Sequence, residues 1–488
     1  MKKHLKVKVV VSLSAVLFFF ACSDNLTIED LNNLNLNQEF SVTFDEEALV
    51  SVELATSVAK AFLSDEIAKK SNAKSLSIAS IETVKDKSNN PLMYVVNYSE
   101  GGWVIVGASR NYYPVLAFSD EGSFEIKPET EMGSVVVWLD ETKEAVRVSA
   151  ALDETTKDQM RTAWQVYETS DKKIASGAKN YQMMYDRMAV LSSLYGSSGW
   201  NPYYSLEDVE GKLKDPNAYQ ALLDLADRFF SPPEYTIVAI KNTNSVTLQA
   251  GPMVLTEWHQ DAPFNDKCAI IFGNIKYPAG CVPIAMAQIM RFHLHPAIVY
   301  YPANHHFNWY NMPFNEADYT NPISTYSTPA LIGNIRSALG MGSGVTNSTI
   351  TAAKDAFLST YNYQSATIVS HNDATVRTEI INQRPVFMSG VANSGVGHAW
   401  VCSGVMDQKT KIYYFVEFFT GSGYNNYNYW TPSNPGTSVY STTSNYYHMN
   451  WGGGNQLGAP QDSWYFTNTF PSGYSYSNNR QNLYIVKP

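Results

Sequence analysis

The fold is decided by a short stretch, AGCVPIAMAQIM, at residues 279–290. Gly280 and Cys281 stand directly before a run of good helix formers, so we predict that a helix begins at the cysteine and runs to His293. The dipole and free N–H groups of a helix N-terminus favour thiolate over thiol, and the thiolate is the nucleophilic form. Because an isolated cysteine is more often a small buried hydrophobic residue, Cys281 is a candidate nucleophile that needs a partner.

A candidate partner follows in the stretch GVGHAWV at residues 395–401. Its glycines, Gly397 among them, allow another segment to approach closely, and the alternating residues after them predict a strand that holds His398 rigidly. A general base needs such placement, although a lone histidine is more often structural or on the surface.

Two further stretches supply amides. Asn450 and Trp451, in NWGGG at 450–454, offer an amide that accepts from the imidazole N–H and an indole that shields this bond, unless the stretch is a plain turn. Upstream, Gln260 offers an NH₂ group that donates to a developing oxyanion together with the backbone N–H of Cys281. Each piece is common alone, but their order along the chain is not.

Together these stretches resemble the streptopain-type cysteine peptidases, a bacterial branch of the papain-like superfamily. The resemblance lies in WHQDAPFN at 258–265, residues 279–290, GHAWV at 397–401 and NWG at 450–452, and residues 94–98, 101–106 and 114–122 resemble the propeptide of that family. It implies an α+β fold, in which a pro-domain precedes a two-lobed catalytic domain with a helical lobe and an antiparallel β lobe. It also implies roles for the site residues: Cys281 as nucleophile, His398 as base, Gln260 in the oxyanion hole, and Asn450 with Trp451 orienting and covering the histidine. Gly280 and Gly397 would line the site.

The charge distribution divides the chain in two. The 488 residues carry a net charge of −10, which leaves no basic face for nucleic acid. Residues 1–240 hold 23 Lys+Arg and 34 Asp+Glu, whereas residues 241–488 hold only 12 and 11. This step in composition predicts two modules, which agrees with a chain that is too long for one ordinary domain.

The N-terminus predicts export. Four lysines precede an uncharged, mostly apolar run at 9–21, which is too short to span a bilayer and fits a secretory signal. The run ends in FFAC, which resembles a lipobox, so Cys22 is the expected lipid anchor; an ordinary cleaved signal peptide is the alternative. We therefore expect a signal peptide at 1–21, a tether at 22–40, and an outer-membrane or cell-surface lipoprotein or a protein secreted after maturation.

Three cysteines remain beyond Cys22, and an odd number outside the cytoplasm leaves at least one thiol unpaired. Cys268 and Cys402 are expected to be structural, either as buried thiols or as a disulfide pair. The chain has no C-x-x-C and no H-E-x-x-H pattern, so neither a metal nor a cofactor is predicted. His293 and His295 are expected in capping or surface roles, and His259 and His448 at the rim of the site.

Local patterns place the elements and the boundary. We predict a helix from Asp45 to about Phe62, a small antiparallel sheet from the runs at 92–98, 103–106 and 115–118, and mainly helix between 140 and 230. The polar stretch 241–251 is expected to be a linker that an external protease reaches. With the resemblance, this gives an inhibitory pro-domain at 41–240 and a papain-like peptidase domain at 241–488.

The expected function is hydrolysis of protein or peptide substrates by an exported cysteine endopeptidase that is made as a zymogen, with its own pro-domain as a partner in cis. Two alternatives stay open. One is a surface-anchored binding lipoprotein on a degenerate peptidase fold, whose Tyr- and Asn-rich loops contact glycans or proteins. The other is an acyl transferase or amidase that uses the same Cys-His pair.

Overall fold

The computed structural model describes residues 8–9, 40–41, 48–67, 77–165, 167, 200–203, 235–273, 275–299, 305–316, 322–342, 346–419, 424–425, 440–453, 462–468 and 480–487. The predicted signal peptide and the anchor Cys22 lie outside these residues, apart from a two-residue strand, β1 (Lys8–Val9), which pairs with β2 (Phe40–Ser41). None of the helices within the described ranges is long and apolar enough to cross a bilayer.

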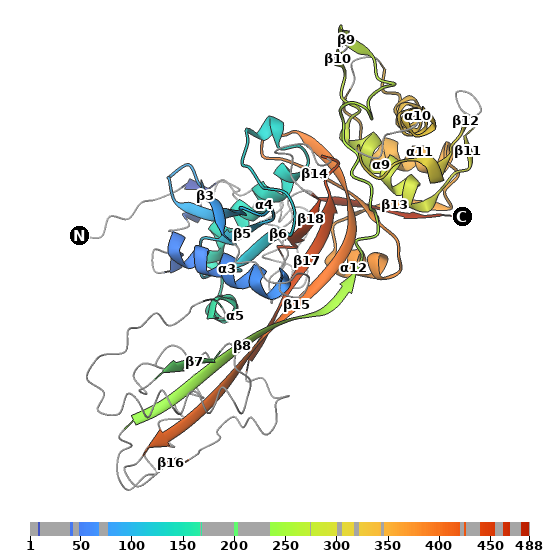
Figure 1. The fold of residues 1–488 in the computed structure, drawn as a ribbon. Helices are drawn as coiled ribbons and strands as arrows, with labels where there is room; N and C mark the ends of the chain where they lie inside the picture. Colours follow the sequence, from blue (N-terminus) through green and yellow to red (C-terminus); the bar gives the residue numbers. More distant parts are fainter. Residues whose placement is uncertain are drawn as a thin grey trace, which may run out of the picture.

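The N-terminal module is an α+β unit in which helices pack on a four-stranded antiparallel meander (Figure 1). Its strands are β3 (Ile78–Lys85), β4 (Pro91–Tyr98), β5 (Trp103–Gly107) and β6 (Val115–Ser119), and its helices are α3 (Val52–Ile67), α4 (Val135–Val148) and α5 (Glu154–Gln165), with short 3₁₀ turns at Glu129–Glu131 and Ser149–Ala151. The predicted sheet is confirmed: its three runs form β4, β5 and β6, in which most of the β-branched and aromatic residues are buried. The first helix begins later than Asp45.

The second part has a helical group at one end and an antiparallel sheet beside it (Figure 1), as the predicted fold class requires. The helices are α9 (Cys281–His293), α10 (Pro322–Ala338), α11 (Ile350–Ser359) and, on the sheet, α12 (Asp373–Ile381). The main strands run in the spatial order β13 (Ser365–Ser370), β19 (Gln481–Val486), β14 (Val386–Val391), β15 (Gly397–Phe419), β17 (Tyr440–Asn450) and β18 (Ser463–Phe466). Shorter elements are β7 (Trp200–Tyr203), β9 (Ile270–Phe272), β10 (Ile275–Lys276), β11 (Ile298–Val299), β12 (His305–His306), β16 (Tyr424–Asn425) and a 3₁₀ turn at Trp309–Asn311.

The two modules share one sheet. Strand β6 pairs with β18, with Phe118 opposite Trp464 and Ala117 opposite Tyr465. The N-terminal meander therefore extends the sheet of the second part instead of packing on it as a separate body, a feature that the sequence did not predict.

Strand β15 separates two hydrophobic cores because successive side chains of a strand point to opposite faces. Trp400 and Cys402 belong to the core shared with the N-terminal module. Ala399 and Val401 belong to the core around α9. The same alternation decides which side chains of the candidate site share a face.

The predicted linker is wrong as a structural element. Residues 241–250 continue the strand β8 (Tyr235–Ala250), which pairs with β15 along its whole length. The stretch is polar, but Val246, Leu248 and Ala250 alternate with Thr and Ser, which is a strand period, and the hydroxyl of Thr247 donates to the backbone carbonyl of Asp407. The mainly helical prediction for 140–230 holds for α4 and α5 and fails at β7; the rest of that range lies outside the described residues.

Candidate active site

Helix α9 begins at Cys281, as predicted. Gly280 precedes it with φ +92°, a conformation that side chains other than glycine rarely adopt, and a Cβ there would lie 2.6 Å from the carbonyl oxygen of Thr346. Pro283 fits in the first turn because its missing N–H has no intrahelical partner there. Glycine thus turns the chain so that the cysteine is the first helical residue.

The thiol of Cys281 lies against the strand that carries His398. Burial raises the pKa of Cys281, and hydrogen bonds from the backbone N–H groups of Ala399 and Val282 oppose this by stabilising the thiolate. Ala399 is the residue next to His398. The fold therefore brings the two motifs, 117 positions apart (398 − 281), to the same place. Within the part of the chain that the structure describes, no hydrogen bond joins the thiol to the imidazole.

His398 belongs to the opposite face of β15. It pairs with Gly390 of the neighbouring strand β14, and by strand alternation its side chain lies on the same face as Trp400. Helix α4 of the N-terminal module covers this face. Burial lowers the pKa of His398, while the carboxylate of Glu129, also in the N-terminal module, raises it. Burial thus favours a neutral thiol and a neutral imidazole over an ion pair.

Asn450 does not accept from the imidazole, contrary to expectation. It pairs with Val401, so it faces α9 and lies on the other side of β15 from His398. Its Oδ1 accepts from Gln288 Nε2 (2.8 Å) and from the backbone N–H of Gly452 (3.2 Å), and its Nδ2 donates to the carbonyl of Thr256 (2.5 Å). The amide is only 1% exposed, so these bonds fix its orientation.

Trp451 does not cover an Asn450–His398 bond either. Its indole is buried between Trp400 and Tyr465, with ring centroids 5.3 and 5.0 Å away. It belongs to the core that the N-terminal module completes. The tryptophan therefore forms part of the module boundary in this state.

Gln260 lies beside the nucleophile segment, as an oxyanion donor requires. Its carbonyl accepts from the N–H of Ala279 (2.7 Å), two residues before Cys281, and its side chain is half-buried. The neighbouring Trp258 is fully buried and donates to the carbonyl of Pro313 (2.8 Å), which fixes the loop. Gly397 is exposed at the start of β15.

The four other histidines that the sequence analysis named have structural partners. His293 contacts the hydroxyl of Tyr363 (3.1 Å) and His295 the carbonyl of Tyr361 (2.9 Å), so both are half-buried in packing contacts. His259 pairs with Glu316 (3.4 Å), and burial lowers its pKa. His448 contacts Ser403 Oγ (2.8 Å), and burial lowers its pKa to about 4.

Cys268 and Cys402 are free, buried thiols that lie in the two different cores, so the disulfide alternative is excluded. Among the described residues, no group of His, Cys, Asp and Glu side chains is arranged to hold a metal ion.

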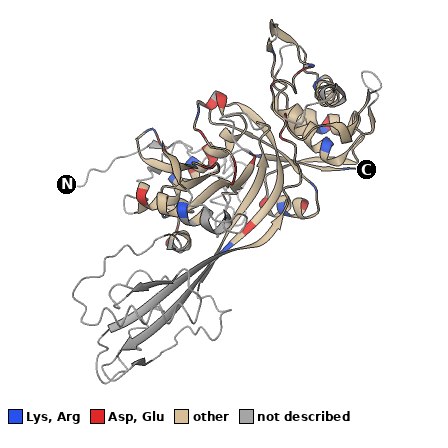
Figure 2. Ribbon diagram, viewed as in Figure 1, with Lys and Arg blue, Asp and Glu red and all other residues tan. Residues whose placement is uncertain are grey.

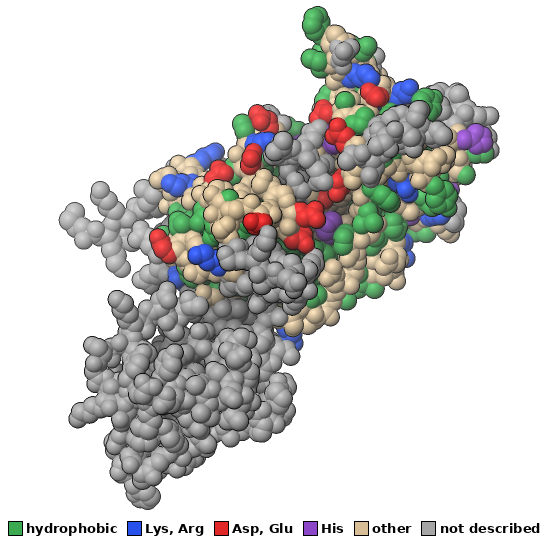
Figure 3. All heavy atoms as spheres, viewed as in Figure 1, with side chains coloured by type: hydrophobic (Ala, Val, Ile, Leu, Met, Phe, Trp, Pro, Cys, Tyr) green, Lys and Arg blue, Asp and Glu red, His purple; other side chains and the backbone are tan. Residues whose placement is uncertain are grey.

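The structure adds residues that no sequence motif indicated. The turn before β15 is held by two carboxylates of the N-terminal module, since Asp140 accepts from the N–H of Asn393 (2.9 Å) and Glu129 from that of Ser394 (3.2 Å). Figure 3 shows acidic side chains gathered along the boundary between the modules. Elsewhere on the described chain, charged residues are scattered over a mostly uncharged ribbon (Figure 2). Pairs between modules carry no local sequence signal.

Comparison with known proteins gives matches to two family models. Residues 258–465 match the Peptidase C10 family, and residues 47–146 match the Spi protease inhibitor family. No curated protein matches the chain significantly. Among solved structures, a fragment of prointerpain A from Prevotella intermedia is 14% identical with a TM-score of 0.44, and covers 83% of this chain and 98% of its own. Active interpain A cysteine protease from the same organism is 17% identical with a TM-score of 0.34, and covers 49% of this chain and 95% of its own.

The site and the two family matches define a cysteine peptidase that carries a second module in front of it. The predicted resemblance to a streptopain-type cysteine peptidase precursor is confirmed over the matched segments: residues 258–465 match the Peptidase C10 family, and the segment at 47–146 in front of them matches a protease inhibitor family.

Proposed function

We propose that the protein is an endopeptidase in which Cys281 is the nucleophile and His398 the base. The observation that carries this is the packing of the nucleophile helix α9 against the histidine strand β15, which brings the Cys281 thiol to the backbone of Ala399, the residue next to His398. A local change of the backbone at the start of β15 that turns the imidazole toward the α9 side would then complete the pair.

The proposed reaction is acyl transfer. His398 takes the proton of the Cys281 thiol, and the thiolate attacks the peptide carbonyl. Gln260 and the backbone N–H of Cys281 stabilise the tetrahedral oxyanion. His398 then protonates the leaving amine as the C–N bond breaks, and water hydrolyses the thioester, which returns the thiol. No cofactor enters this scheme.

Asn450 has a different role in this proposal from the one that its position in sequence suggested. Gln288, Thr256 and Gly452 hold its amide against α9, so it ties the end of β17 to the nucleophile helix. We propose that it positions Cys281 relative to β15 and does not bind His398 in the precursor.

We also propose that the N-terminal module inhibits the peptidase. Three features support this: α4 covers the face of β15 that bears His398, Ser134 Oγ donates to the carbonyl of Ala399 (2.9 Å), and the carboxylate of Glu129 lies near the imidazole. Together they favour an imidazole turned away from the thiol. Activation would require this helix to leave.

Two matched proteins test the assignment: the matured wild type and its Cys281→Ala variant. Each is incubated with casein and with a thiol-directed peptidyl inhibitor, and the adduct is located by mass spectrometry. We expect a single adduct on Cys281 and casein hydrolysis only in the wild type. Absence of an adduct would favour a binding protein, and an adduct without hydrolysis of casein would favour another acyl substrate.

Export and lipid anchoring at Cys22 remain proposals supported by the N-terminal sequence alone. Metabolic labelling with a radioactive fatty acid should mark the wild type and not Cys22→Ala. Equal labelling of both proteins would refute this anchor.

A further inference from the structure

Helix α4 crosses three strands of the peptidase sheet at the level of His398. Three contacts define its path, from β15 over β14 to the start of β19: Ser134 Oγ to the carbonyl of Ala399 (2.9 Å), Val137 against Gly390, and the carboxylate of Glu141 to the guanidinium of Arg480. The three helix residues are spaced i, i+3 and i+7, which places them on one face of the helix.

The dimensions of helix and sheet agree. Seven residues of helix rise about 10.5 Å, and two strand spacings are about 9.5 Å. The strand register gives the same result independently. In the register of β19, β14 and β15, Gln481 is paired with Ser389, and Ser389 with Ala399. One residue along, Arg480 therefore lies in the same row as Gly390 and His398, on the face that α4 covers. Arg480 therefore lies about 10 Å from the backbone of His398.

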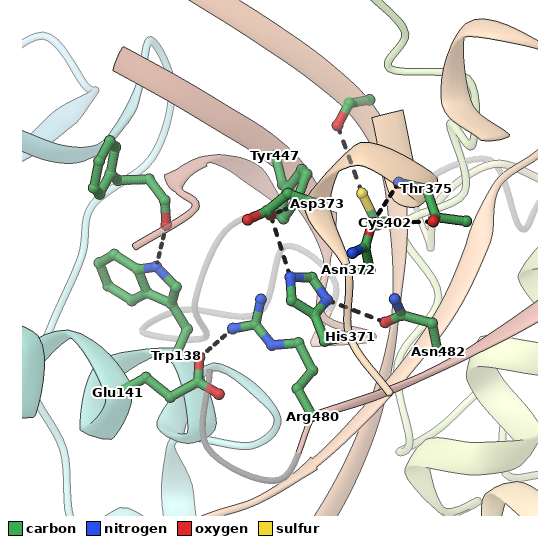
Figure 4. A network of polar contacts seen from close by, with 12 residues as sticks. Trp138, Glu141, His371, Asn372, Asp373, Thr375, Cys402, Tyr447, Arg480 and Asn482 are labelled. Carbon is green, nitrogen blue, oxygen red and sulfur yellow. Dashed lines mark hydrogen bonds and ion pairs between the residues drawn. The ribbon is translucent and has the colours of Figure 1, made fainter. Parts of the chain in front are cut away.

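The Glu141–Arg480 ion pair is buried between the modules. The two side chains are 2% and 1% exposed, and the guanidinium lies 5.7 Å from the ring centroid of Trp400. Arg480 Nε and Nη1 have no hydrogen-bond partner in the described part of the chain (Figure 4). A guanidinium is always charged and binds carboxylates in a forked geometry, so this site has unused donors even while Glu141 is present.

A second carboxylate in this polar network, that of Asp373, is already engaged. Asp373 accepts from the hydroxyl of Tyr447 and pairs with His371 Nε2 (3.3 Å) (Figure 4). His371 in turn contacts Asn482 Oδ1 (3.3 Å) with its other ring nitrogen. When the N-terminal module leaves, Glu141 leaves with it, and Arg480 keeps its charge on the face that bears His398.

We propose that Arg480 determines specificity in the matured peptidase by binding a carboxylate of the substrate in the place of Glu141. This inference rests on the proposed function. At about 3.3 Å per extended residue, 10 Å corresponds to about three residues, so the carboxylate would stand about three residues from the scissile bond. It is either an acidic side chain or the C-terminal carboxylate of a short peptide, since the two groups present the same chemistry.

The test compares peptides that differ in one group. A neutral peptide that the matured enzyme cleaves is remade with Glu or with Gln at each position in turn, and kcat/KM is measured for each pair. A second set ends in a free carboxylate or in an amide. We expect the charged member to be cleaved about tenfold faster at one position about three residues from the bond, or at the terminus, and this position identifies the source of the carboxylate.

Variants assign the preference to Arg480. Arg480→Gln should reduce the Glu/Gln ratio to about one, and Arg480→Lys should retain part of it because the charge remains without the fork. Arg384→Gln is the matched control, since Arg384 pairs with Glu379 of its own module (2.5 Å) and should leave the ratio unchanged. Folding of each variant is checked by the rate at which a small neutral reagent alkylates Cys281.

Four outcomes are informative. The proposal is overturned if the wild type cleaves Glu and Gln peptides equally at every position and also cleaves peptides with acid and amide termini equally. It is also overturned if the Glu/Gln ratio of the wild type survives in Arg480→Gln. If Arg480→Gln does not fold, a full wild-type ratio in Arg480→Lys would equally count against the forked contact. If the matured wild type cleaves no peptide at all, it is the proposed function that fails.

Discussion

The hydrogen bonds that the side chain of Gln288 makes from the nucleophile helix α9 predict a large loss of stability when this residue is changed. Gln288 is fully buried; it accepts from the hydroxyl of Thr256 (2.9 Å) and donates to Asn450 Oδ1 (2.8 Å). We consider Gln288→Met, which keeps the length of the side chain, in a precursor that also carries Cys281→Ala to prevent self-cleavage.

The magnitude follows from the groups that remain. The Thr256 hydroxyl loses its acceptor in a dry site, which costs about 1–3 kcal/mol. Asn450 Oδ1 keeps the N–H of Gly452 at 3.2 Å, so the loss there is about 1 kcal/mol. Because Met replaces Gln without leaving a large cavity, we expect unfolding to become easier by about 3 kcal/mol in total.

Urea unfolding followed by tryptophan fluorescence measures this change. Gln249→Met is the control, because Gln249 is exposed on β8 and its substitution should alter the free energy of unfolding by less than about 0.5 kcal/mol. In the enzyme with Cys281 intact, Gln288→Met should also lower kcat, since Asn450 would no longer be fixed against α9. If Gln288→Met were as stable as Gln249→Met, the network would not hold the site.

Gly280→Ala should destabilise the precursor by about 2–4 kcal/mol in urea unfolding, because its φ of +92° and the 2.6 Å approach of a Cβ to the carbonyl oxygen of Thr346 force the start of the helix to shift. Gly342→Ala is the control and should be near neutral, because nothing lies within 4 Å of a Cβ there. Equal effects of the two substitutions would contradict this reasoning. Val137→Arg should displace α4 from Gly390 and speed the alkylation of Cys281 in the precursor several-fold. Lys143→Arg, on the same helix, is the control and should leave the alkylation rate unchanged. If Val137→Arg also left this rate unchanged, α4 would not restrict access to the site. His448, with its pKa lowered by burial to about 4 against about 6.5 unfolded, contributes stability that is complete above pH 6.5 and is lost as pH falls toward 4, at up to about 1.4 kcal/mol per pH unit. The loss between pH 7 and pH 5 should therefore be about 2 kcal/mol smaller in His448→Gln than in the wild type, and parallel curves for the two proteins would refute this.

The sequence predicted those parts of the site that depend on local chemistry. Gly280 before a helix-forming run places Cys281 at a helix N-terminus, and alternating residues after Gly397 place His398 on a strand. Both signals lie within a few residues, so no knowledge of the tertiary fold was needed.

The sequence did not predict on which face of β15 each side chain lies. Asn450 and His398 were expected to bond, but the pairing of Asn450 with Val401 puts the amide on the α9 face and the histidine on the α4 face. A shift of one residue in register would reverse this, and register depends on contacts distant in sequence. The contact of Glu141 with Arg480 escaped prediction for the same reason, since 339 positions separate the two residues.

The most direct measurement of the central claim is the rate at which iodoacetamide alkylates Cys281 as a function of pH, in the precursor, in the matured protein and in matured His398→Ala. In the precursor, burial holds the thiol pKa above its usual range, so the rate should rise only at alkaline pH. The matured wild type should show an additional reactive thiolate at acid to neutral pH, and His398→Ala should lose it. If the matured wild type and His398→Ala titrate alike, Cys281 and His398 do not act as a pair.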